Sequence, residues 1–213
     1  MLDKSLPFES LIMRIESDKI EALPEAVLPD GFSFRFFEPS DEKHWASIET
    51  SAGEFPSEEE ALTFFNAAFM PYVEQLKKRC FFILNSEGVP IANSSAMFAE
   101  SELGYQPCVH WVAVRPEYQG MGLGKLITIK TLNIFRDLDP GKPVWLHTQT
   151  WSWPAIRLYH KLGFNIVKDE PLANNNTIDG VTTIRKSGFD NAIEVLKTVF
   201  DEDYVNELKR TAV

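Results

Sequence analysis

The sequence of 213 residues is long enough for one large domain, or for one domain with an appendage. Hydrophobic residues make up 44% of the chain, including 16 Phe, so a substantial core is expected. The formal net charge of −10 argues against a nucleic-acid partner, because such a protein needs a basic face to neutralise phosphates.

The two cysteines, Cys80 and Cys108, each lie in an apolar run, which is typical of buried thiols in a reducing compartment. No zinc-ligand spacing is present, so no metal site is expected. The first ten residues lack the apolar core of a signal peptide. No apolar run approaches the roughly 20 residues that a membrane span needs. The sequence therefore predicts a cytoplasmic protein with no membrane partner.

The N-terminal part of the chain predicts two strands and a helix. Residues 10–15 are apolar enough for a short strand, and residues 23–31 form a connector with several prolines. Residues 32–36 alternate between apolar and polar side chains, which predicts a half-buried strand. Ser40 is placed to cap a helix that runs to about Ser51.

A second helical region follows, and its start is marked by Ser57 and Glu60, the signature of a capping box. Its apolar face continues to Leu76, and Pro71 is expected to kink the helix or divide it in two. Aromatic residues such as Phe64 either wall a substrate pocket or belong to an ordinary core between helix and sheet.

The middle of the chain predicts an antiparallel meander of strands at residues 80–84, 89–98 and 105–114. The third strand is nearly all apolar, as expected for a central strand that is covered on both faces. The remaining elements are a helix at about 122–138, a strand at 144–150, a short helix from Pro154 to Leu162, a closing pair of strands at 164–168 and 177–185, and an amphipathic helix at 189–210. This order predicts an α/β (α+β) fold, with a mixed sheet and helices on both of its faces.

A glycine-rich turn joins the third meander strand to the following helix. Alternate glycines leave the backbone unshielded, so successive N–H groups can converge on an anion while the helix dipole adds positive potential. The spacing differs from that of a dinucleotide-binding fingerprint and from that of a P-loop. The turn therefore predicts a diphosphate site, made by Gln119, Gly120, Met121, Gly122, Leu123, Gly124 and Lys125.

Two motifs together resemble the GNAT N-acetyltransferase superfamily. Gln119-x-x-Gly122-x-Gly124 fits the family signature [Q/R]-x-x-G-x-[G/A], directly after a central strand. Some thirty residues later, the segment from Ala155 to Phe164 fits the family pattern A-x-x-L-Y-x-K-x-G-F. The resemblance covers about residues 32–185. It implies a splayed central sheet and acetyl-CoA as the co-substrate.

The resemblance also implies roles for individual residues. The glycine turn would hold the pyrophosphate of coenzyme A, and the backbone of Val112, Ala113 and Val114 would hold the pantetheine arm and the thioester. Tyr159 matches the tyrosine that is taken to protonate the departing thiolate. The amine would attack the thioester directly. Ser152 stands where the family often has Asn, so the contact of that Asn with the pantetheine is in doubt.

Three side chains are candidates for the groups around the acceptor amine. An attacking amine must be neutral, so a base has to take its proton. His110 on the central strand and Glu54 in the loop between the first two helices are the candidate bases, and His147 on the next strand is placed to line the same cleft. Each is also compatible with a purely structural role. Trp151 and Trp153 either narrow the channel or belong to the core.

The sequence therefore predicts an N-terminal extension at residues 1–30, an acetyltransferase domain at 31–186 and a C-terminal amphipathic helix at 187–213. That helix packs either on its own domain or on a homodimer partner. The expected activity is acetylation of a small-molecule primary amine. Two alternatives stay open: acetylation of a peptide or protein amine, and a non-catalytic module that binds coenzyme A.

Overall fold

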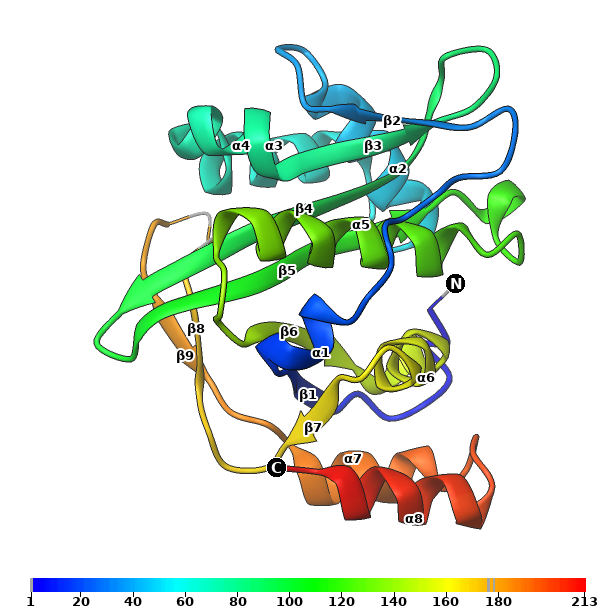
Figure 1. Cartoon of the computed structure of the whole chain (residues 1–213), viewed down its shortest axis with the longest axis vertical. Helices are drawn as coiled ribbons and strands as arrows, with labels where there is room; N and C mark the ends of the chain where they lie inside the picture. Colours follow the sequence, from blue (N-terminus) through cyan, green and yellow to red (C-terminus); the bar gives the residue numbers. More distant parts are fainter. Residues whose placement is uncertain (1, 176, 178) are drawn as a thin grey trace.

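The computed structural model describes residues 2–175, 177 and 179–213. One seven-stranded sheet has the strand order β2-β3-β4-β5-β6-β1-β7, and β8 and β9 form a separate hairpin (Figure 1). The strands of the large sheet are β1 (Ser10–Ile15), β2 (Ser33–Phe36), β3 (Cys80–Leu84), β4 (Pro90–Ser101), β5 (Gly104–Val114), β6 (Val144–Gln149) and β7 (Asn165–Val167). The hairpin consists of β8 (Leu172–Asn174) and β9 (Thr183–Arg185).

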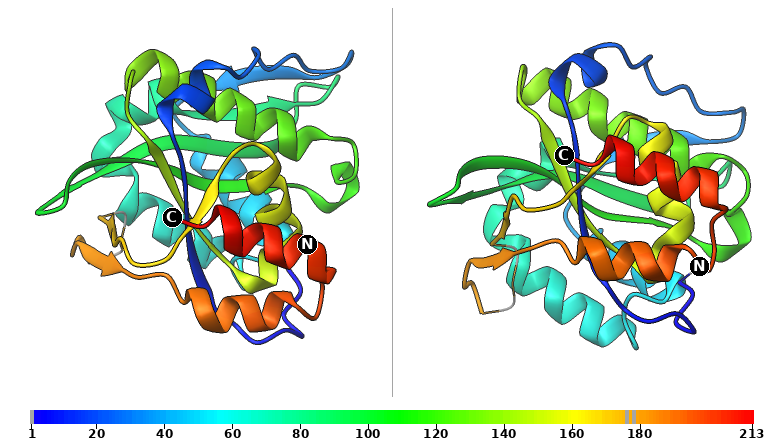
Figure 2. Two further views of the ribbon diagram at one scale, coloured as in Figure 1. Left: turned by 60° about the horizontal axis from the view of Figure 1, so that its bottom comes forward. Right: turned by 90° about the horizontal axis from the view of Figure 1, so that it is seen from below.

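Helices cover both faces of the sheet. One face carries α5 and α6, and the opposite face carries α2, α3 and α4 (Figure 2). The short helix α1 contacts α5, and α7 and α8 pack beside β1 and β7. The helices are α1 (Ser17–Glu21), α2 (Glu42–Ala52), α3 (Glu58–Ala68), α4 (Val73–Arg79), α5 (Leu123–Leu138), α6 (Trp153–Lys161), α7 (Phe189–Leu196) and α8 (Glu202–Thr211). Among the described residues, no helix is both long and apolar enough to cross a bilayer.

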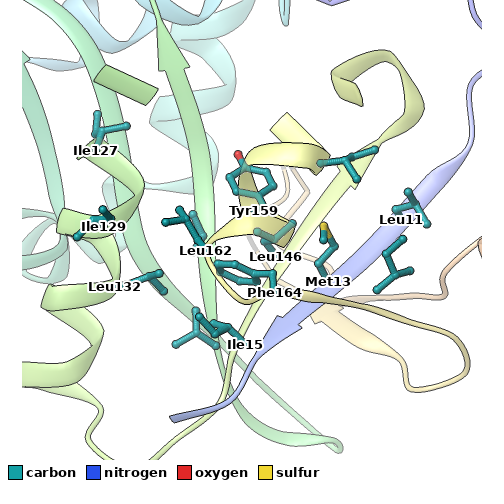
Figure 3. Packing of buried hydrophobic residues seen from close by; sticks show 14 of the residues in the cluster. Leu11, Met13, Ile15, Ile127, Ile129, Leu132, Leu146, Tyr159, Leu162 and Phe164 are labelled. Atoms are coloured by element: carbon teal, nitrogen blue, oxygen red, sulfur yellow. The ribbon is translucent and has the colours of Figure 1, made fainter. Parts of the chain in front are cut away.

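The N-terminal strand β1 lies inside the sheet, between β6 and β7, and runs antiparallel to both. Leu11, Met13 and Ile15 point into the larger core, where Figure 3 shows them beside Leu146 and Phe164. The predicted strand at residues 10–15 is therefore confirmed. Its position was not predicted, because its partners in β6 lie far along the chain, from Val144 paired with Ile15 to Gln149 paired with Ser10.

Strands β4 and β5 pair along most of their length, and a bulge interrupts the pairing. Asn93 pairs with Ala113 and Ser95 with His110, so β5 carries one extra residue at this point. Trp111 lies in the bulge with a φ of 52°, a left-handed conformation that costs a non-glycine residue about 1–3 kcal/mol. The side chain of Asn93 donates a hydrogen bond to the Trp111 carbonyl at 3.0 Å and holds the bulge in place.

The parallel strands β5 and β6 pair only at Cys108 with Trp145 and at Val109 with Leu146. Beyond Val109 the two strands separate, while the outer edge of β6 remains paired with β1 as far as Gln149. The sheet is therefore open at the carboxyl ends of two neighbouring central strands.

Several local predictions are confirmed. Ser57 caps α3, since its hydroxyl accepts a hydrogen bond from the Glu60 amide at 3.2 Å. Pro71 lies in a short 3₁₀ segment that separates α3 from α4. The predicted cap at Ser40 is wrong: Ser40 has a φ of 84° and Asp41 precedes the helix. The Asp41 carboxylate instead accepts hydrogen bonds from Arg35 and from the Glu38 amide.

The C-terminal region differs from the prediction in two ways. The expected closing pair of strands does not form, because β7 pairs with β1 while β8 pairs with β9. The expected helix at residues 189–210 is divided into α7 and α8, and Asp201 caps the second helix by accepting from the Tyr204 amide. Ile193, Leu196 and Leu208 from these helices lie in the larger core.

Removing core volume on β1 tests the importance of this inserted strand. Met13 is fully buried, so Met13→Ala is expected to lower the free energy of unfolding by about 2–5 kcal/mol in urea denaturation. Val27→Ala is the control, because Val27 is 75% exposed and its truncation is expected to change stability by less than about 0.5 kcal/mol. Equal effects of the two substitutions would contradict the inserted position of β1.

Candidate active site

A cavity of about 790 Å³ opens where β5 and β6 separate. The cavity is lined by residues of β5 and β6, by residues of α2, α3 and α6, and by residues of β8 and β9 with Thr177 and Asp179 between them. The volume is in the range of ordinary small-molecule sites. Predicted site residues that line it are Glu54, His110, Val112, His147, Ser152 and Tyr159.

The glycine turn lies at the end of β5 and leads into α5. Gly120 and Gly122 have φ angles of 78° and 80°, which explains the need for glycine at both positions. No described residue accepts a hydrogen bond from the backbone N–H groups of residues 120–124, and no side chain caps α5. Exposed N–H groups at a helix N-terminus form an anion site, and exposed Lys125 adds a formal positive charge beside them.

The turn is connected to the strand before it through Gln119. The side chain of Gln119 donates a hydrogen bond from Nε2 to the Val114 carbonyl at 2.9 Å. Ala113 is buried, whereas Val112 and Val114 are half-buried. Because β6 has left β5 at this level, the edge of residues 112–114 on that side is not paired with a strand. An extended ligand can therefore lie along this edge.

Tyr159 lies on α6 and packs against Phe164, with ring centroids 5.9 Å apart. Figure 3 shows its hydroxyl at the end of the ring that is remote from Phe164. The Tyr159 side chain lines the cavity. Burial raises the pKa of Tyr159 above its ordinary value, and Glu54 and Glu49 raise it further. The phenol therefore keeps its proton at neutral pH.

The histidines His110 and His147 lie on the two separating strands and both line the cavity. Burial lowers the pKa of each to about 4, and the positive charge of Arg185 contributes to both shifts. Both imidazoles are therefore neutral near pH 7. Cys108 on the same strand as His110 also lines the cavity, but burial raises the pKa of its thiol to about 12. It is not a reactive thiolate.

Glu54 follows α2 and lines the cavity near the N-terminal segment. Burial raises its pKa, while the positive charge of Lys4 and a hydrogen bond from Gln149 act in the opposite direction. Lys4 is held there because its ammonium group donates to the Gly53 carbonyl at 2.9 Å. Glu54 is thus a carboxylate beside the cavity, as the sequence predicted for a candidate base.

Glu49 on α2 is a further cavity residue, and the sequence analysis missed it. Its side chain is buried, and Oε1 accepts a hydrogen bond from Asn93 at 2.6 Å, the same amide that holds the bulge at Trp111. Oε2 has no hydrogen-bond partner among the described residues. Burial raises the pKa of Glu49 to about 8. Glu49 lies on the same apolar face of α2 as Trp45 and Ile48. An acidic residue on an apolar helix face was the signal in the sequence that could have identified it.

Ser152 and its two neighbouring tryptophans have different surroundings. The Ser152 hydroxyl lies 3.3 Å from the Gln149 side-chain amide, which donates to it beside the cavity. Trp151 donates to the Leu6 carbonyl at 2.7 Å and holds the N-terminal segment. Trp153 packs edge-on against Phe200 at 5.6 Å. Both tryptophans therefore have packing roles. Among the described residues, no group of three His, Cys, Asp or Glu is arranged to bind a metal.

The comparison with protein families decides the classification. The model of the acetyltransferase (GNAT) family matches residues 42–164, which include both sequence motifs and most of the cavity. The chain belongs to the GNAT acetyltransferase family. The predicted family and the predicted mixed, splayed sheet with helices on both faces are both confirmed.

Curated relatives of this GNAT protein include mycothiol acetyltransferases. That of Pseudarthrobacter chlorophenolicus is 32% identical over 146 residues, covering 67% of this chain and 45% of the relative. That of Thermomonospora curvata is 31% identical over 157 residues, covering 67% and 47%. The chain therefore spans about half the length of the curated relatives that it matches.

Solved structures show the same fold at lower sequence identity. A GCN5-related N-acetyltransferase from Sphaerobacter thermophilus has a TM-score of 0.59 at 19% identity, covering 76% of this chain and 49% of the other. A tandem GNAT protein from the clavulanic acid biosynthesis pathway has a TM-score of 0.52 at 15% identity, covering 76% and 51%. In both cases the GNAT fold of this chain matches about half of a longer chain.

The raised pKa of Glu49 predicts how stability depends on pH. The folded protein binds this proton more tightly than the unfolded chain, whose value is 4.5, so the stabilisation is present below pH 4.5 and is lost as pH rises through about 8. Between pH 5 and pH 9, Glu49 is expected to lower the unfolding free energy of the wild type by about 4 kcal/mol. Glu49→Gln is expected to abolish this part of the decrease, measured by urea denaturation at each pH. Exposed Glu87→Gln is the control. Parallel pH profiles for wild type and Glu49→Gln would contradict the assignment.

Proposed function

We propose that this GNAT protein transfers an acetyl group from acetyl-CoA to the primary amine of a small molecule. The observation that carries the proposal is the cavity at the separation of β5 and β6, with a protonated phenol and a buried carboxyl group both facing it. Membership of the acetyltransferase family supports the reaction class. The mycothiol acetyltransferases among the relatives support a small-molecule acceptor.

The donor side of the site consists of the glycine turn and the exposed edge of β5. Backbone N–H groups between Gln119 and Gly124, with the charge of Lys125, would bind the pyrophosphate of coenzyme A. The backbone of Val112, Ala113 and Val114 would take the extended pantetheine arm, because β6 leaves this edge unpaired. The Ser152 hydroxyl beside the cavity would add a polar contact.

The chemistry requires one proton acceptor and one proton donor. The neutral amine nitrogen attacks the thioester carbonyl, the new C–N bond forms, and the C–S bond breaks. Tyr159, which lines the cavity, gives its proton to the departing sulfur. A base takes the proton that the nitrogen loses.

Among the groups that could act as this base, Glu49 has a pKa of about 8, close to neutral, and an oxygen without a described partner. His110 is the weaker choice, since burial lowers its pKa to about 4. Glu54 lies beside the same cavity and remains the second carboxylate candidate. We therefore propose Glu49 as the base, with Glu54 attracting the protonated amine before it binds.

Thiol release from acetyl-CoA across a panel of small amines and peptides tests this function. Small amines are expected to release stoichiometric thiol together with the N-acetylated product, detected by mass spectrometry. Turnover with peptides alone would favour acetylation of peptide or protein amines. Tight binding of acetyl-CoA with no turnover of any amine would favour a non-catalytic module that binds coenzyme A.

Removal of the phenol hydroxyl tests the proton donor. Tyr159→Phe is expected to lower kcat by about 10²-fold or more, the usual contribution of a positioned general acid. The dissociation constant of acetyl-CoA, measured by calorimetry, is expected to change little, since the ring packing is kept. Tyr72→Phe, at an exposed position on the 3₁₀ segment after α3, is the control. Unchanged turnover of Tyr159→Phe over the whole pH range would remove Tyr159 from the mechanism.

A further inference from the structure

One cation in the cavity has no role in the mechanism above. Arg185 is the last residue of β9, and its side chain lines the cavity from the hairpin. It is half-buried, and burial lowers the pKa of its guanidinium. Of the residues that the structure describes, no carboxylate lies within 4 Å of it. Asp179 also lines the cavity, but its carboxylate accepts from the Val181 amide within its own turn.

The neighbours of Arg185 are neutral polar groups that hold it in position. Its Nη1 lies 3.3 Å from Nε2 and 3.4 Å from Nδ1 of His147, so the guanidinium rests against the imidazole ring. The Nε2 atom of His147 lies 2.9 Å from the Ser10 hydroxyl on β1, which fixes the ring. Both His147 and His110 lose their positive charge because of burial and the nearby arginine. Arg185 is therefore the source of positive charge in this part of the cavity.

An arginine that is partly removed from water and lacks an acidic partner is unfavourable in the isolated protein. Its planar guanidinium is suited to bidentate hydrogen bonding with a carboxylate or a phosphate. An anion in the cavity would supply the missing partner. Two acidic side chains, Glu49 on α2 and Glu54 in the loop after it, also line the cavity. The cavity thus contains carboxyl groups that can bind an amine and an arginine that can bind an anion.

We propose that Arg185, supported by His147, binds an anionic group of the acceptor, so that the substrates are primary amines that also carry a carboxylate or a phosphate. This inference rests on the proposed N-acetyltransferase function. Phe8, Phe64 and Trp111 line the same cavity, so an aromatic or apolar part between the two charged ends fits the lining.

Matched pairs of acceptors test the subsite. The pairs are 4-(aminomethyl)benzoate with 4-(aminomethyl)benzamide, L-phenylalanine with L-phenylalaninamide, and O-phosphoethanolamine with ethanolamine. In at least one pair, the anionic member is expected to have a kcat/KM at least tenfold above that of its neutral partner. The pair that shows the preference identifies whether the anion is a carboxylate or a phosphate, and how far it lies from the amine.

Substitution of the arginine assigns the preference to its charge. Arg185→Gln is expected to lower kcat/KM for the anionic member by about 10- to 100-fold, and for the neutral member by less than threefold. Arg185→Lys is expected to restore part of the loss, because the positive charge is kept. Lys186→Gln is the matched control: it removes the same charge from the neighbouring exposed residue and is expected to leave both members unchanged. Equal losses for both members in Arg185→Gln would overturn the subsite.

A binding measurement separates this inference from the proposed function. Calorimetry with 4-(acetamidomethyl)benzoate and its amide, the products of the first pair, needs no turnover. One outcome is that the wild-type protein binds the acid more tightly than the amide, that Arg185→Gln loses this preference, and that no amine is turned over. This outcome upholds the anion subsite and overturns the acetyltransferase assignment. Turnover of amines without preference for the anionic members upholds the function and overturns the subsite. Absence of both turnover and binding of any anionic member overturns the subsite as well.

Discussion

The separation of β5 from β6 is the constraint on which the site depends. The two parallel strands share only two residue pairs before they part, so their further peptide groups face a cavity instead of each other. The bulge at Trp111 lies on β5 just beyond its last pair with β6, and β1 holds the outer edge of β6. Without β1 the strand β6 would have no support beyond Leu146. The cavity and the exposed strand edge are therefore consequences of one break in hydrogen bonding.

The same region holds groups that the fold alone does not need. Glu49 is a buried acid with one unpartnered oxygen, Trp111 has a left-handed backbone, and Arg185 lacks an acidic neighbour among the described residues. Each of these features lowers the stability of the folded chain, and all of them border one cavity. By contrast, Arg79 is buried and forms a 2.7 Å ion pair with Asp139. Unsatisfied groups gathered at one place are the expected mark of a site that is completed by its ligands.

The sequence was informative at several places where the signal was local, although the local cap predicted at Ser40 was wrong. The glycine turn, the cap at Ser57 and the division at Pro71 each depend on a few adjacent residues, and the structure has all three. The pairing of β1 with β6 could not be predicted, since register between distant strands is decided by the assembled core. No local sequence pattern pointed to Arg185, because its lack of an acidic neighbour depends on which residues the fold brings together around the cavity. Glu49 gave one signal, its position on the apolar face of α2.

The central position of β1 also determines the order in which the chain can assemble. During synthesis, residues 10–15 leave the ribosome long before β6 at 144–149 and β7 at 165–167, which flank them in the sheet. The meander β2 to β5, by contrast, consists of neighbours in sequence apart from the helices α2 to α4. Strand β1 is therefore made before its partners β6 and β7, and its apolar side chains stay exposed until these strands follow. Nascent chains are thus expected to need protection for this segment until β6 and β7 have been made.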